Sequence, residues 1–253
     1  MERLQDVSRI AAFFLGWDET MIWSCLQGVM GEAYADSAEN PQSAMICVNC
    51  FAFAAGKPDE SLVRGWYSRQ TAPYSVITAR DTGWDPVFEA VGKAHTRRVE
   101  RYAFKKEPDV FDTDTLNRLV SRLSNQYTLK LIDEDIYHLC RKTGWSADFV
   151  QGYADYEMFH RYGLGVVAFH GEELVSGASS FSGYSGGIEV EIDTKPEYRR
   201  QGLAAACAAR LILECIRRGL YPSWDAQNQW SLHLAEKLGY HYSHAYPAYE
   251  FWK

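Results

Sequence analysis

Residues 188–193 alternate between aliphatic and acidic side chains, a pattern that could supply acid–base chemistry. The even positions carry Ile, Val and Ile, and the odd positions are Glu189, Glu191 and Asp193. A β-strand has a side-chain period of two, so one face would be aliphatic and the other would carry three carboxylates. Because like charges raise carboxyl pKa values, we expect a raised pKa for at least one of the three. The alternative is a solvated row on an exposed sheet face.

The segment that follows, from Arg199 to Ala204, reads Arg-Arg-Gln-Gly-Leu-Ala and has the composition of an anion site. Gly202 and Ala204 leave little side-chain bulk where a helix would begin, so a diphosphate could approach the N–H groups of the first turn. The helix dipole favours negative charge there, and Arg199 and Arg200 add positive charge. The segment is neither a P-loop nor a dinucleotide fingerprint. An ordinary strand–turn–helix connection with small residues is the alternative.

The hydropathy pattern predicts the elements that must position these residues. A helix over 202–218 has a broad apolar stripe that contains Cys207 and Cys215, with charged residues on the opposite side. Around it we predict a mixed sheet covered by helices, in an α/β protein. The predicted strands are 44–53, 74–79, 96–106, 127–132, 165–170, 174–181, 188–194, 221–225 and 240–252, and the predicted helices are 3–15, 19–34, 85–95, 133–140, 202–218 and 228–238.

A polar break at Lys106–Asp109 indicates two domains, which we divide near residue 115. Residues 1–115 would form a smaller α/β domain, and residues 116–253 would carry the anion loop. The order helix, helix, strand, strand in the first domain is compatible with a degenerate half of the same fold as the second. That domain has no phosphate loop of its own, so we expect it to serve substrate recognition or dimerisation.

Composition excludes several classes of protein. The 253 residues carry a formal net charge of −7, which argues against general binding of nucleic acid or an anionic membrane and mildly favours a cationic, amine-bearing partner. No apolar run is long enough to span a bilayer, and the first residues do not form a secretory signal. Six cysteines at irregular spacings fit a reducing cytosol. We therefore expect a cytoplasmic protein.

Two other features are interpreted as structural. Cys47 and Cys50 lie inside a predicted strand, where a spacing of three puts the sulfurs on opposite faces, and no second pair completes a zinc site. We predict buried free thiols and no metal. The basic run 93–106 is interpreted as a solvated or salt-bridged surface rather than an RNA contact.

The two motifs of the C-terminal half together carry a resemblance to a known family. The loop fills the pattern Arg/Gln-x-x-Gly-x-Gly/Ala at Arg199, Gly202 and Ala204. Further on, Trp224–Asn228 is followed by a helix that ends in Lys-Leu-Gly-Tyr at Lys237–Tyr240. Residues 118–253 thereby resemble the GCN5-related N-acetyltransferase (GNAT) superfamily. The residues around both motifs are most similar to those of a bacterial branch that includes the zwittermicin A resistance acetyltransferases.

The resemblance implies acetyl-CoA as the acyl donor and direct attack by a primary amine in a ternary complex. The loop, with Gln201 and Leu203 among its members, would hold the pyrophosphate, and backbone groups of Ile192, Asp193 and Thr194 would hold the pantetheine arm. Asn228 would bond that arm near the thioester, although it is also a natural helix N-cap. Glu189 or Glu191 would remove the ammonium proton, and a small-molecule amine is the expected acceptor.

The sequence departs from the superfamily at Ala235, where many relatives carry a tyrosine that protonates the leaving thiolate. Either the thiolate leaves unassisted or another donor replaces the tyrosine; Ser231, His233 and Tyr240 are nearby in sequence. The missing tyrosine leaves open a non-catalytic acyl-CoA-binding regulator. A tRNA-dependent aminoacyl transferase built on tandem acetyltransferase folds is a further alternative, against which the intact loop and the negative charge both count.

Overall fold

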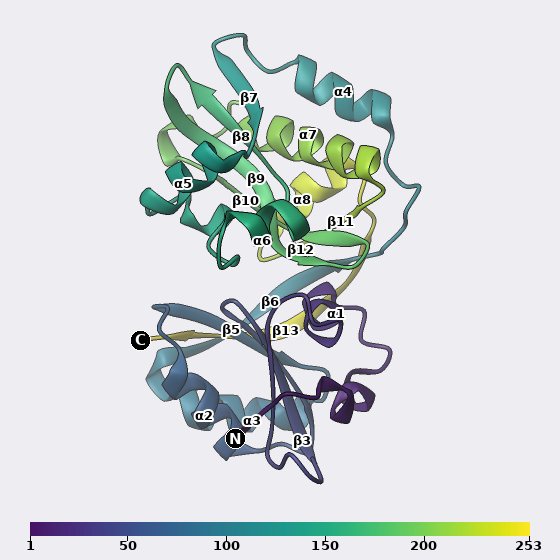
Figure 1. The fold of residues 1–253 in the computed structure, drawn as a ribbon, viewed down its shortest axis with the longest axis vertical. Helices are drawn as coiled ribbons and strands as arrows, with labels where there is room; N and C mark the ends of the chain where they lie inside the picture. Colours follow the sequence, from purple (N-terminus) through teal and green to yellow (C-terminus); the bar gives the residue numbers. More distant parts are fainter. The chain divides into compact units, whose positions relative to one another are not determined.

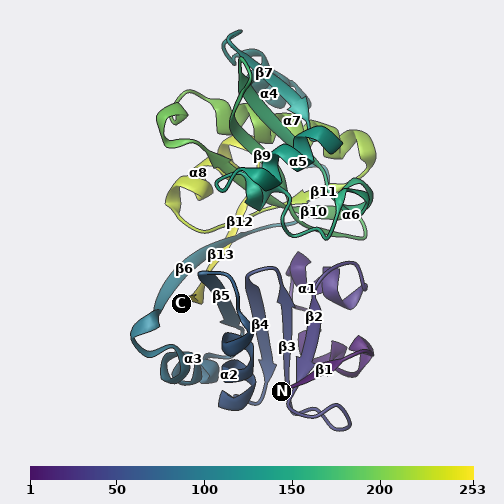
Figure 2. The same cartoon turned by 60° about the vertical axis from the view of Figure 1, so that its left-hand side comes forward.

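The chain folds into two compact units. The computed structural model describes all residues from 1 to 253 (Figures 1 and 2). The first unit consists of Met1–Arg101 together with Ala245–Lys253, and the second of Tyr102–His244. The sequence predicted a single division near residue 115. The chain instead crosses between units within two strands, β6 (Thr96–Phe104) and β13 (Tyr242–Trp252).

The first unit is built on a sheet in which five strands from the N-terminal part are followed by β13 and then by β6. These strands are β1 (Glu2–Leu4), β2 (Glu32–Ala35), β3 (Ser43–Val48), β4 (Phe51–Gly56) and β5 (Tyr74–Ala79). Pairing is antiparallel from β1 to β4, parallel between β4 and β5, and antiparallel again between β5 and β13. Helix α2 (Glu60–Arg69) makes the crossover between β4 and β5, as the parallel pairing requires (Figure 2).

Three sequence predictions for this unit are wrong. The predicted helix 3–15 consists of strand β1 and two short 3₁₀ turns, Val7–Arg9 and Ala11–Phe14. The predicted helix 19–34 is helix α1 (Thr20–Leu26) followed by β2. The predicted strand 44–53 is a hairpin, because Asn49 adopts a left-handed φ of 53° between β3 and β4. Both strands are mostly buried, so the apolar run continues across the turn.

The second unit has a five-stranded sheet in the order β11-β10-β9-β8-β7. Its strands are β7 (Tyr127–Leu131), β8 (Gly165–His170), β9 (Glu173–Tyr184), β10 (Gly187–Thr194) and β11 (Tyr221–Ser223). Pairing is antiparallel from β7 to β10 and parallel between β10 and β11, with helix α7 (Leu203–Arg218) as the crossover. The remaining elements are α4 (Thr113–Ser121), α5 (Glu134–Lys142), α6 (Tyr156–Tyr162), β12 (Asp225–Ala226) and α8 (Gln229–Leu238); β12 pairs with Tyr102 and Ala103 of β6. The expected mixed, mostly antiparallel sheet with helices is confirmed.

The two units repeat one topology. Each has four successive antiparallel strands, then a helix, then a strand parallel to the fourth. Each unit also contains a strand segment from the other half of the sequence, β13 beside β5 in the first and the end of β6 beside β12 in the second. This repetition supports the expectation that the N-terminal part is a second copy of the same fold.

Helix α7 forms the centre of the core of the second unit. Its apolar stripe packs with residues of β8, β9 and β10, including Val166, Ala178 and Ile188, all fully buried. Cys207 and Cys215 lie in this core as predicted, and burial raises the pKa of each thiol to about 12. Both thiols are therefore packing groups rather than nucleophiles.

Candidate active site

Strands β10 and β11 form a fork. Strand β11 pairs in parallel with β10 only over Gly187–Glu189, where Glu189 lies opposite Ser223. Strand β10 continues to pair with β9 as far as Thr194. At the same level the β9–β10 ladder contains a bulge, because Ser182 lies opposite Glu189 but Ser180 lies opposite Val190. The bulge and the end of β11 together open one edge of β10 beyond Glu189.

The three carboxylates of β10 are not uniformly exposed to solvent. Ile188 is fully buried in the core, and Val190 and Ile192 pack against that core, so the aliphatic face predicted from the alternation is confirmed. Glu189 is only 4% exposed, which excludes an exposed sheet face for this residue. Glu191 is half-buried. The two candidate bases therefore differ in their access to solvent, a difference that the sequence did not predict.

The open edge of β10 presents backbone N–H groups. The Ile192 N–H donates to Oε1 of Glu191 at 3.1 Å, and the Thr194 N–H donates to Oδ1 of Asp193 at 2.7 Å. The N–H of the next residue, Lys195, points the other way and donates to the Val175 carbonyl of β9 at 2.9 Å. Since N–H groups alternate along a strand, those of Ile192 and Thr194 point away from β9, along the edge that β11 leaves uncovered.

The start of helix α7 has the features of an anion cradle. Gly202 is the N-cap residue with a φ of 83°, and no side chain caps the helix. A Cβ at Gly202 would meet no atom within 4 Å, and the first turn contains no acidic residue. Leu203 sends its side chain into the core, so the loop offers its backbone rather than its side chains. Arg199 and Arg200 are exposed beside it. Uncapped N–H groups with open space above them fit a pyrophosphate.

Several contacts brace this loop. Arg199 donates from Nε to the Thr194 carbonyl at 3.0 Å and lies 3.5 Å from Oδ1 of Asp193. Tyr127 donates its hydroxyl to Oε1 of Gln201 at 2.5 Å. The hydroxyl of Tyr198, in the turn before the loop, donates to Glu173 at 2.8 Å. Arg199 thus ties the loop to the end of β10 in addition to carrying charge, a role that its sequence position does not reveal.

Asn228 is the N-cap of α8, and its Oδ1 accepts from the Ser231 N–H at 3.0 Å. Ala235 is fully buried. Among the neighbours considered as replacement acids, Ser231 accepts from Trp224 Nε1 at 3.1 Å, and Tyr240 donates to the Pro222 carbonyl at 2.6 Å. Burial raises the pKa of Tyr240 well above its usual range. The Tyr240 hydroxyl is therefore committed to a structural contact and is not a ready proton donor, whereas Ser231 only accepts a hydrogen bond there.

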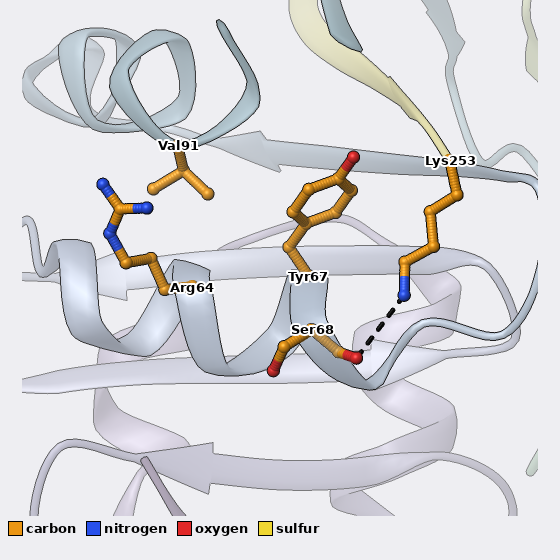
Figure 3. A pocket seen from close by; sticks show the side chains of 5 residues that line it. All are labelled: Arg64, Tyr67, Ser68, Val91 and Lys253. Atoms are coloured by element: carbon orange, nitrogen blue, oxygen red, sulfur yellow. Dashed lines mark hydrogen bonds between the residues drawn. The ribbon is translucent and has the colours of Figure 1, made fainter.

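The first unit contains an open hollow of about 430 Å³, lined by Arg64, Tyr67 and Ser68 of α2, by Val91 of α3 (Asp85–Gly92) and by Lys253 (Figure 3). Its cationic groups are already engaged. Arg64 pairs with Glu60, and Nζ of Lys253 donates to the Ser68 carbonyl at 3.4 Å. The hollow therefore holds no acid–base pair and no phosphate cradle.

Comparison with known proteins identifies this arrangement. The GNAT acetyltransferase family model matches residues 11–249. An uncharacterized N-acetyltransferase, YdfB of Bacillus subtilis (strain 168), is 31% identical over 234 residues, which are 87% of this chain and 86% of that protein. The crystal structure of a GCN5-related N-acetyltransferase-like protein from Streptococcus suis 89/1591 is 43% identical, covers 98% of this chain and 99% of its own, and superposes with a TM-score of 0.92.

A more distant solved structure shares only the fold. A tandem GNAT protein from the clavulanic acid biosynthesis pathway is 12% identical, with a TM-score of 0.53, over 87% of this chain and 82% of its own.

The family model and the relatives define the class of this protein. The chain belongs to the GNAT acetyltransferase family and is an N-acetyltransferase by class. The motifs alone indicated a resemblance over residues 118–253. The family match is wider and begins near the N-terminus. No helix in the structure combines the length and apolar character that crossing a membrane requires.

Proposed function

We propose that this protein transfers the acetyl group of acetyl-CoA to a primary amine of a small molecule, by direct attack in a ternary complex. The observation that carries the proposal is the pairing, within one unit, of an uncapped helix start at Gly202 with a strand fork that begins at a buried carboxylate, Glu189. The first site matches a diphosphate, and the second matches an extended arm that needs backbone partners.

Acetyl-CoA would be held by backbone groups along this path. The N–H groups of Gly202, Leu203 and Ala204 would bind the pyrophosphate, supported by the charges of Arg199 and Arg200. The edge groups of β10 at Ile192 and Thr194 would pair with the amides of the pantetheine arm, as an added strand would, whereas the Asp193 carbonyl between them faces β9 and accepts from Ser176. The carboxylates of Glu191 and Asp193 now bond the N–H groups of Ile192 and Thr194, and they would swing aside. Asn228 would contact the arm near its thioester end.

Glu189 is the better candidate for the general base. It is the last residue of β10 that pairs with β11, so it lies where the fork begins, and it is buried. A carboxylate at the start of the fork lies where it could take the proton of a bound ammonium. Glu191 is half-buried, with one oxygen bonded to the backbone, and is the second candidate.

Departure of the thiolate would proceed without a tyrosine acid. Ala235 is fully buried, and Tyr240 is engaged elsewhere. A thiolate has a moderate pKa and is an adequate leaving group without prior protonation. The same observation supports one rival, a regulator that binds acetyl-CoA and does not turn it over.

The experiment is calorimetric titration with acetyl-CoA of the wild type, Gly202→Glu and Gly219→Glu. Gly219 ends the same helix, has a φ of 67° and has open space around it, so its variant matches the strain and the charge. We expect micromolar binding by the wild type and by Gly219→Glu, and a loss of at least about 100-fold in Gly202→Glu, where a carboxylate replaces the anion.

Thiol release with a panel of primary amines then separates the two candidate functions. Turnover with any amine supports the transferase, whereas binding without turnover supports the regulator. Absence of acetyl-CoA binding by the wild type would refute both.

A further inference from the structure

A buried row of three polar side chains crosses the sheet where the fork begins. Ser182 on β9, Glu189 on β10 and Ser223 on β11 are directly opposite one another in the two ladders. Opposed residues project from the same face of a sheet, with Cβ atoms about 5 Å apart. Their side chains are 0%, 4% and 2% exposed, respectively. The row therefore lies inside the protein, at the level of the bulge.

No hydrogen bond within the protein explains why the hydroxyl of Ser182 is buried. Its Oγ is buried and has no hydrogen-bond partner among the protein atoms. The other buried serines of β9 differ: Ser179 donates to the Phe149 carbonyl at 2.7 Å, and Ser180 bonds the Tyr153 hydroxyl at 2.8 Å. A buried hydroxyl without a partner costs about 1–3 kcal/mol, so such groups are generally satisfied by water or by a ligand.

We infer that Ser182 is a positioning residue, which with Ser223 holds the water through which Glu189 takes the proton from the acceptor ammonium. The inference rests on the proposed acetyl transfer. A buried water needs two to four polar partners, and this row supplies two hydroxyls and a carboxylate. One water can bridge the hydroxyls and the carboxylate across the spacing of neighbouring strands.

The proton and electron balance of the step is complete. One ammonium N–H bond breaks; its proton passes to the water, and the water gives a proton to the Glu189 carboxylate. The freed nitrogen lone pair bonds to the acetyl carbonyl carbon, and the C–S bond breaks with its electrons on sulfur. The second N–H proton is lost as the amide forms, and the thiolate takes up one proton from solvent. Glu189 then returns its proton to solvent, so no other reactant is needed.

The first arm of the test is structural and needs no turnover. A high-resolution crystal structure of the wild type should show an ordered water within hydrogen-bond distance of Ser182 Oγ and of a Glu189 carboxylate oxygen. In Ser182→Ala that water should be absent or displaced. A dry row in the wild type, or a water that stays in place in the variant, would overturn the inference whether or not the protein is a transferase.

The second arm is thiol release from acetyl-CoA with two acceptors, butane-1,4-diamine, which is protonated at pH 7, and hydroxylamine, which is largely not. Ser182→Ala should lose about tenfold in kcat with the diamine, the effect of one positioned hydrogen bond, and should keep its rate with hydroxylamine. Ser182→Thr retains a hydroxyl and should recover most of the diamine rate. Affinity for acetyl-CoA should be unchanged in both variants.

Ser179→Ala is the matched control, because it removes an equally buried hydroxyl from the same strand that bonds backbone carbonyls instead. It should lower the Tm and leave the ratio of the two acceptor rates unchanged. Equal rate losses for both acceptors in Ser182→Ala would indicate a merely structural serine and would refute the inference. Failure of the proposed function itself would appear differently, as no acetyl-CoA binding by the wild type.

Discussion

The two units share a topology, and they differ where the fourth strand passes into the crossover helix. In the second unit, α7 starts at Gly202 without a side-chain cap, and a Cβ there would meet nothing within 4 Å. In the first unit, Asp59 caps α2 by accepting from the Leu62 N–H at 3.0 Å, and Glu60 adds a second acidic residue. The nearby Gly56 has no space, since a Cβ would lie 2.3 Å from the Gln42 carbonyl oxygen. The protein's own carboxylate thus occupies the position that an anion would take.

The two units also differ in how far the fourth strand is covered by the strand parallel to it. In the first unit β5 accompanies β4 from Phe51 to Ala54, close to the end of β4 at Gly56, and the β3–β4 ladder has no bulge. In the second unit β11 leaves β10 at Glu189, and the chain continues to Thr194. Strand β4 reads Phe-Ala-Phe-Ala-Ala-Gly and carries no carboxylate. One copy of the fold therefore has an open strand edge, a buried carboxylate and an uncapped helix start, and the other uses the same topology for packing.

The largest effect is expected from Glu189→Gln, which removes the buried carboxylate of β10 that β4 lacks. If Glu189 is the base, kcat for acetyl transfer should fall by about 10²- to 10⁴-fold, because the ammonium proton loses its acceptor, and the Kd for acetyl-CoA should stay within about twofold. Steady-state thiol release and calorimetry measure the two quantities. Glu191→Gln is the companion variant; a larger loss there than in Glu189→Gln would transfer the role to Glu191.

Arg199→Ala should weaken acetyl-CoA binding by about tenfold, because it removes a charge at the cradle and the bond that ties the loop to the Thr194 carbonyl. Titration calorimetry gives the Kd. Arg210→Ala removes the same charge from an exposed position further along α7 and serves as the control. Equal affinities in the two variants would show that Arg199 contributes nothing to cofactor binding.

Acid stability should depend on Glu214 of α7 and hardly on Glu60 of α2. Arg217, and then Arg218, donate hydrogen bonds to the buried Glu214 carboxylate and lower its pKa to about 2 from an ordinary 4.5. Because the folded-state pKa lies below that of the unfolded chain, this stabilisation is complete above about pH 4.5 and is lost as the pH falls toward 2. Glu214→Gln should remove about 1 kcal/mol of it, since the arginines are partly exposed.

The measurement is the urea midpoint at pH 7 and at pH 3.5. Glu60→Gln is the control, because the ion pair of Glu60 with Arg64 is about half exposed on both sides, at 51% and 52%, and is worth only a few tenths of a kcal/mol. A pH dependence of equal size in the two variants would contradict the assignment.

The smallest effect on function is expected from Asp59→Ala. Loss of the α2 cap should cost about 1 kcal/mol of unfolding free energy, whereas Asp59→Asn, which can still cap, should cost little. Neither variant should add a second acetyl-CoA site, because β4 lacks an open edge and Gly56 lacks space. A calorimetric stoichiometry of two per chain in Asp59→Ala would show that the cap alone distinguishes the units.

Short-range patterns in the sequence determined much of the second unit. The alternation over 188–193 predicted a strand with one aliphatic face, and the loop 199–204 with the apolar stripe after it predicted the helix that became α7. These predictions succeeded because a period of two or 3.6 and a small-residue helix start are local properties. Local patterns did less well in the first unit, where helix α2 was missed and one apolar run concealed the hairpin at Asn49.

Only the tertiary structure decided which residues share a site. The fork depends on where β11 stops beside β10, and the row of Ser182, Glu189 and Ser223 joins three strands that the sequence separates. The same is true of the unit boundary, because β13 pairs with β5, far from it in the chain. Pairing register and closing strands are set by long-range packing, which no window of sequence contains. The sequence by itself therefore determined the chemistry that β10 and the loop can offer, and the tertiary structure decided that only one of the two copies presents it.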